Sequence, residues 1–171
     1  MTFSSSRRPT RAWLLTTLAV LLAATSAAAE SPAEHPLEPP DRSSPRATLE
    51  TFFTSIDTAW DLYTTGDPGF QEPFLDARGC LDLSAIPPLV FQEASAETAL
   101  LLKDVLDRIE LPPVEAIPDA AAVAESGISS WTVPHTEITL SLQTEGQNAG
   151  QWLFSSDTCL LYTSPSPRDL N

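Results

Sequence analysis

Apolar residues recur at helical spacing in the stretch that follows Ser44. They lie three or four positions apart and form one broad stripe, which consists of Leu49, Phe52, Phe53, Ile56, Trp60 and Tyr63. Ser44 is a good N-cap and Pro45 suits the first helical position. Gly66, Asp67 and Pro68 end the pattern. The stripe predicts a helix that buries this face, and we interpret its aromatic residues as core rather than as a cofactor site.

A second amphipathic pattern covers residues 94–109. Its apolar face consists of Ala99, Leu102, Leu106 and Ile109, widened by Leu100 and Val105. Lys103, Asp104, Asp107 and Arg108 occupy much of the remaining surface. The pattern predicts a second helix with a solvated charged face, where local ion pairs contribute little stability.

The segments around this helix are less regular. Phe70, Phe74 and Leu75 suit a short helix that turns at Arg78 and Gly79. Pro87 and Pro88 break any regular structure after it. A short helical turn is expected over residues 120–124.

Strict alternation begins at Ile138. Ile138, Leu140 and Leu142 alternate with polar residues, as in a half-buried strand. Residues 145–150 suit a turn, and residues 151–155 return with Trp152 and Phe154. The expected fold is α+β: a mainly helical domain with a C-terminal β-hairpin, after a signal peptide and a Pro-rich linker.

Residues 1–29 have the features of a secretory signal peptide. Three arginines precede an apolar core of roughly 12 residues, which is short of the ~20 that a membrane-spanning helix needs. Ala27 and Ala29 fit the small-residue cleavage pattern, so cleavage is expected before Glu30. The alternative is an uncleaved membrane anchor. Residues 30–42 hold four prolines and are expected to be an extended linker.

The other end of the chain resembles a foreign sequence. Residues 159–169 read CLLYTSPSPRD, which is similar to the translation of a transposase-type sequencing adapter. We therefore expect residues 159–171 to be an adapter-derived tail and residues 43–158 to be the native domain. The alternative is a natural tail rich in proline and serine.

The expected roles of the two cysteines, Cys80 and Cys159, depend on whether residues 159–171 are native. An exported protein favours a disulfide between them. If Cys159 belongs to an adapter, Cys80 is a lone thiol and is expected to be a small buried side chain rather than a nucleophile.

Composition narrows the classes of partner. The net charge is −14, and only six basic residues follow residue 29, against all 23 acidic ones. Such a surface disfavours nucleic acid and anionic lipid, which both need clustered lysine and arginine.

No catalytic, cofactor-binding or metal-binding residue is predicted. His135, with Glu137 nearby, lacks a serine in a nucleophile elbow. Two histidines and one credible cysteine do not form a zinc site. The carboxylates that could act as an acid–base pair are Asp82, Glu93, Asp104 and Asp107. Chance supplies many such pairs among 23 acids, so the protein is not expected to be an enzyme.

Four segments between residues 43 and 158 carry a family resemblance. They are residues 44–53 (SPRATLETFF), residues 80–87 (CLDLSAIP), residues 101–108 (LLKDVLDR), and the hairpin, residues 133–138 (VPHTEI) with residues 150–158 (GQWLFSSDT). In this order they resemble the N-terminal extramembrane region of a branch of the bacterial small-conductance mechanosensitive ion channel family.

The resemblance implies a periplasmic domain at the inner membrane, beside the membrane helices of a channel that assembles as a homo-oligomer. The full-length parent would conduct ions under membrane tension, whereas this fragment is expected to have no pore. Two alternatives remain open: a standalone exported binding or interaction domain, and a secreted hydrolase that uses His135 or carboxylates such as Asp82.

Overall fold

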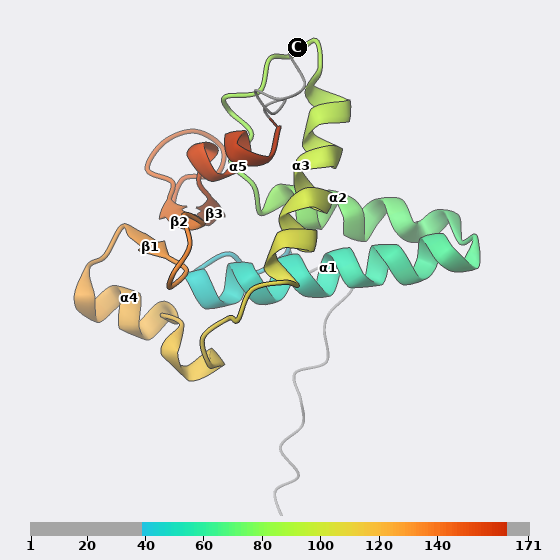
Figure 1. Ribbon diagram of the computed structural model, residues 1–171. Coiled ribbons are helices and arrows are strands. Elements are labelled where there is room, and N and C mark those ends of the chain that lie inside the picture. The colour runs from blue at the N-terminus through green and yellow to red at the C-terminus, as the bar shows by residue number, and fades with distance from the viewer. Residues whose placement is uncertain (1–38, 164–171) are drawn as a thin grey trace, which may run out of the picture. The chain divides into compact units, whose positions relative to one another are not determined.

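The computed structural model describes residues 39–163. The expected signal peptide, with Ala27, Ala29 and Glu30 at its cleavage site, lies outside the described residues, as do most of the linker and the end of the tail. In the described part, five α-helices and a three-stranded antiparallel sheet form the predicted α+β fold (Figure 1).

The first helix, α1 (Pro45–Thr65), matches the predicted boundaries. The Ser44 hydroxyl accepts a hydrogen bond from the backbone N–H of Ala47 at 3.2 Å, as an N-cap does. At the other end Gly66 has φ 76°, a left-handed conformation that closes the helix at low cost only for glycine. Local capping chemistry therefore sets both ends of α1.

The other helices differ from expectation mainly at their boundaries. A 3₁₀ turn, η1 (Pro68–Phe70), leads into α2 (Gln71–Gly79), which returns beside α1. The next helix, α3 (Phe91–Leu106), runs crosswise to this pair and ends near α1 (Figure 1). The α3 helix begins and ends three residues earlier than predicted. A second 3₁₀ turn, η2 (Val114–Ala116), precedes α4 (Ala120–Ser126), which is capped by Asp119.

The hairpin is confirmed, and a third strand joins it. The strands β2 (Thr139–Leu142) and β3 (Trp152–Phe154) pair in antiparallel register, with Leu140 opposite Phe154. The strand β1 (Ser130–Thr132), which the sequence reasoning missed, pairs with β2 on its other side. The strand order is β1-β2-β3, which leaves β3 at one edge of the sheet.

Three distant segments cover that edge of β3. The backbone N–H of Trp152 donates to the carbonyl of Arg42 at 2.7 Å, and the hydroxyl of Thr48 donates to the carbonyl of Trp152 at 2.8 Å. Two residues further along the strand, the N–H of Phe154 donates to the carbonyl of Cys80 at 2.9 Å, and the N–H of Asp82 donates to the carbonyl of Phe154 at 2.8 Å. A short parallel bridge thus seals the edge, since Leu81 pairs with Phe154.

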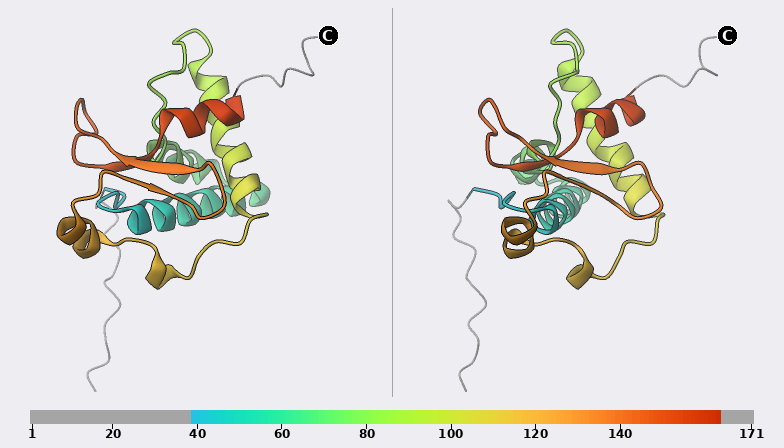
Figure 2. Two further views of the ribbon diagram at one scale, coloured as in Figure 1. Left: turned by 60° about the vertical axis from the view of Figure 1, so that its left-hand side comes forward. Right: turned by 90° about the vertical axis from the view of Figure 1, so that its left-hand side faces the viewer.

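The core lies where α1 meets the sheet. The rings of Phe52 and Phe154 contact edge to face, with centroids 5.2 Å apart. All three residues of β3 are buried, as expected for a strand covered on both faces, and Figure 2 shows α1 and α5 on opposite sides of the sheet. The largest fully buried side chains are Trp152, Phe52, Phe154, Leu102, Leu106, Ile138, Leu140, Leu153 and Val133.

The last helix, α5 (Ser156–Thr163), crosses the expected boundary between residues 158 and 159. Cys159 is buried in the core cluster, and α5 lies near α3 above the sheet (Figure 2). Residues 159–163, the part of the expected tail that the structure describes, therefore form a helix that packs on the domain.

Replacing either of two core side chains should destabilise the fold. We expect Phe52→Ala and Leu106→Ala to lower the free energy of unfolding by about 2–5 kcal/mol, because each leaves a cavity where the wild-type side chain is fully buried. Leu89 is 95% exposed and provides the matched control, so Leu89→Ala should change stability by less than about 0.5 kcal/mol. Urea melts measure all three variants, and equal losses at positions 89 and 106 would contradict this core.

Candidate functional site

An open groove of about 680 Å³ lies in the corner between α1, the η1–α2 segment and α3. Its apolar wall consists of Ile56, Ala59, Trp60, Tyr63, Phe70, Phe74, Ala96 and Leu100. Its polar wall consists of Asp57, Lys103, Asp104 and Asp107. Apolar and aromatic walls with a few polar groups are typical of a binding site.

The aromatic part of the apolar wall, hereafter the aromatic wall, corrects one sequence-based prediction; it consists of Trp60, Tyr63, Phe70 and Phe74. We expected the whole α1 stripe to be core, but Trp60 and Tyr63 are each 60% exposed. Their ring centroids lie 6.1 Å apart, and Tyr63 meets Phe70 edge to face at 5.4 Å. The last turns of α1 contact η1 and α2, and residues of α3 line the groove opposite them.

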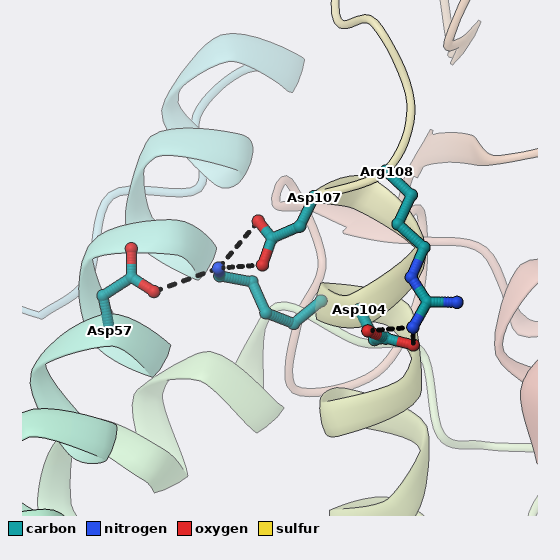
Figure 3. Close-up of polar contacts among 5 residues, drawn as sticks. Asp57, Asp104, Asp107 and Arg108 are labelled. Carbon is teal, nitrogen blue, oxygen red and sulfur yellow. Dashed lines mark hydrogen bonds and ion pairs between the residues drawn. The ribbon is translucent and has the colours of Figure 1, made fainter.

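Lys103 organises the polar wall. Its ammonium Nζ lies 3.1 Å from Asp57 Oδ1 on α1 and donates to Oδ2 of Asp107, directly after α3, at 2.6 Å (Figure 3). It also lies 5.3 Å from the centroid of the Phe53 ring. We expected a merely solvated charge here, but the Lys103 side chain is only 19% exposed and joins two helices.

The surroundings of Lys103 shift its titration. Partial burial on its own would lower the pKa of Lys103, but hydrogen bonds to Asp107 and Asp57 outweigh it and raise the pKa above the ordinary value of 10.5. The ammonium form is therefore the form that holds α1 and α3 together at neutral pH.

The four candidate carboxylates do not assemble into an acid–base pair with defined roles. Asp104 pairs with Arg108 at 2.8 Å, and Asp107 is held by Lys103 (Figure 3). Asp82 accepts a hydrogen bond from the N–H of Ser84 at 3.1 Å, so its carboxylate shapes a turn. Glu93 is exposed in the first turn of α3.

His135 lies in a tight turn before β2. It has φ 63°, and the N–H of Thr136 donates to the carbonyl of Val133 at 3.2 Å across Pro134 and His135. Proline followed by a positive φ is the pattern of a type II turn, whose third position favours glycine. His135 therefore occupies a glycine-favouring position of the turn between β1 and β2, and its side chain is exposed.

Cys80 is buried, as expected for a small core side chain. Desolvation by burial raises the pKa of the Cys80 thiol to about 12. The nearby Arg42 guanidinium lowers that pKa, but by less than burial raises it. Such a thiol is a poor nucleophile at neutral pH. Cys80 is a free cysteine, so the alternative of a disulfide at this position is wrong for this structure.

The described part of the chain has neither a metal-binding cluster nor a membrane-spanning helix. Between residues 39 and 163 no three His, Cys, Asp or Glu side chains gather where they could hold a metal ion. None of the helices in that range has both the length and the apolar character needed to cross a membrane.

Comparison with protein-family models, curated proteins and solved structures finds no match.

The groove itself was missed because its lining comes from three elements far apart in the chain. One signal was available, since Trp60 and Tyr63 extend the α1 stripe further than a small domain needs for its core. Helical spacing identified these residues but could not show which of them lack a partner.

Removing the Lys103 ammonium should weaken the contact between α1 and α3. We expect Lys103→Met to lower the free energy of unfolding by about 1 kcal/mol, because Asp57 and Asp107 lose their shared cation but stay hydrated enough to avoid a larger penalty. Arg108→Met is the matched control, since Arg108 and Asp104 form an exposed pair, and it should cost less than about 0.5 kcal/mol.

The same variant has a defined pH dependence. A raised lysine pKa adds stability that is fully present below the unfolded pKa and is lost as pH rises through the folded pKa. In urea melts, the difference in free energy of unfolding between wild type and Lys103→Met should therefore stay constant from neutral pH to about pH 9.5. It should shrink as pH rises above about 10.5. Equal losses for Lys103→Met and Arg108→Met at neutral pH would contradict a specific role for Lys103.

The turn at His135 can be tested with two substitutions. Glycine adopts a positive φ freely, whereas a β-branched residue is strained there. We expect His135→Gly to be more stable than His135→Val by about 1–2 kcal/mol in thermal or urea melts. Equal stability of the two variants would contradict the left-handed conformation.

Proposed function

We propose that residues 43–158 serve as an extramembrane domain of a tension-gated channel of the small-conductance mechanosensitive family. The domain works on the periplasmic side of the bacterial inner membrane, without a catalytic step, and its partners are the channel's membrane helices and neighbouring subunits. Tension opens such a channel because stretch favours the state that occupies more membrane area. Ions then pass through membrane helices outside the residues described here.

One observation carries this proposal. The four segments that resemble the channel family supply the central contacts of the fold. Phe52 comes from the first segment, Leu81 from the second, Leu102 and Leu106 from the third, and Phe154 from the hairpin, and all of them belong to one buried cluster. Segments that resemble one family in the same order, and that form one core, support a resemblance of whole domains rather than of scattered motifs.

A standalone exported binding domain is the second candidate. The α5 helix favours it, because Cys159 is buried in the core and the fold therefore uses residues beyond 158. The groove also favours it, since an open apolar wall suits a binding role with or without a channel. The two candidates differ in what the gene encodes after Thr158.

Sequencing the source gene across the codons for Thr158 and Cys159 separates the candidates. For a channel we expect a reading frame that departs from the present sequence at Cys159 and runs on into apolar stretches of about 20 residues. A genome that encodes residues 159–171 followed by a stop codon would overturn the channel proposal and leave the binding domain.

A functional measurement follows if the frame continues. The full-length gene should raise the survival of a bacterial host that lacks its own mechanosensitive channels after a sudden drop in external osmolarity. The matched control is the same gene without residues 43–158. We expect this deletion to change the tension threshold in patch-clamp recordings, and an unchanged threshold would argue against a role of the domain in gating.

A further inference from the structure

The groove is too open to enclose a small molecule. Trp60 and Tyr63 are each 60% exposed, and Leu100 is 49% exposed. Small-molecule sites bury most of their ligand, whereas these side chains form a shallow wall with aromatic residues along it. Contiguous exposed apolar surface of this kind is typical of a contact with another protein segment.

The length of the wall matches a helical segment. Along α3 and the residue that follows it, the groove is lined from Ala96 to Asp107, which are eleven residues apart and span about 16 Å along the helix axis. About three turns of a partner helix have that length. An amphipathic helix docks in such a groove through residues spaced three, four and seven positions apart.

The flanks of the groove are acidic. Asp61 lies four residues after Asp57 on α1, and Glu93 and Glu97 lie three residues before Ala96 and Leu100 on α3, so helical periodicity places all three beside the lining. All three are exposed. The nearest cations are already paired, Lys103 of the polar wall with Asp57 and Asp107, and Arg108 beside the wall with Asp104.

The remaining basic side chains of residues 39–163 are also engaged elsewhere. Arg42 donates to the carbonyl of Gly79, Arg46 pairs with Asp119 at 3.3 Å, and Arg78 lies 5.7 Å from the centroid of the Phe91 ring. The surface therefore has unpaired negative charge, and the whole chain carries −14. Such a field repels a second copy of the same face and an anionic lipid surface, and it attracts a cationic partner.

We propose that this groove binds a basic amphipathic helix of a partner protein. The apolar face of that helix lies on Trp60, Tyr63 and Leu100, and its lysines or arginines meet the acidic flanks. The inference rests on the groove and its charges, not on the channel resemblance. It holds whether the domain stands alone or belongs to a channel.

The test uses the purified full chain and three fluorescein-labelled peptides of about 18 residues, which is long enough to form a helix on binding. One peptide consists of leucine and lysine in an amphipathic order. A second has glutamate in place of lysine, and a third has the leucines and lysines in scrambled order. Fluorescence anisotropy should show the amphipathic lysine peptide binding at least about tenfold more tightly than either control, and less tightly as salt is raised.

Variants of the chain locate the binding surface. Trp60→Ala and Leu100→Gln should each weaken binding of the amphipathic lysine peptide by about tenfold, since both remove apolar contact in the groove. Leu89→Gln is the matched control because Leu89 is exposed but does not line the groove, and it should leave binding unchanged. All three residues are exposed enough to be replaced without unfolding, which thermal melts verify.

Several outcomes would overturn the inference. Equal binding of the lysine and glutamate peptides would remove the role of charge, and equal binding of the scrambled peptide would indicate non-specific attraction. No binding by the wild-type chain would exclude this class of partner. Dimerisation of the chain that Leu100→Gln abolishes would assign the groove to a second copy. None of these results bears on the gene sequence after Thr158, so failure here is distinguishable from failure of the channel proposal.

Discussion

The backbone of β3 at the open edge of the sheet is the constraint on which the rest of the structure depends. This strand has three residues, all buried, and two of them present their N–H and carbonyl groups away from β2. A buried backbone group without a partner costs about 1–3 kcal/mol. Arg42, Thr48 and the backbone of residues 80–82 supply all four partners. Satisfying one short edge therefore fixes the end of the linker, the start of α1 and the chain after α2.

This anchoring divides α1 into two parts with different roles. Its first turns lie against the sheet, where Thr48 bonds to β3 and Phe52 contacts Phe154. Its last turns extend past the sheet and contact η1 and α2 instead. The chain after α2 bonds to β3 through Cys80, and α3 is linked to α1 through the Lys103 ion pair. The core therefore holds in place the helices that line the groove. The groove is thus a consequence of how the sheet edge is sealed.

Local signals predicted much of this fold. The boundaries of α1 followed from a serine cap and a glycine stop, and the hairpin followed from alternation around Leu140. The strand β1 was missed because three residues are too few to show a period. The bridge at Leu81 and the ion pair from Lys103 to Asp57 were missed because each joins segments that are far apart in the chain. Periodicity identifies which face of a helix is apolar, but only tertiary structure shows whether another element covers that face.

The scaffold and the groove also differ in how they relate to the channel family. The segments that resemble the family include most of the residues that cover the edge of β3 and part of the core, such as Phe52, Leu81 and Phe154. They also include Lys103, Asp104 and Asp107 on the polar wall. The aromatic wall, from Trp60 to Phe74, lies outside those segments. A shared scaffold can hold different recognition surfaces, because function depends on the site rather than on the fold. The channel proposal therefore concerns where this domain works, whereas the proposed helix-binding groove concerns what it binds.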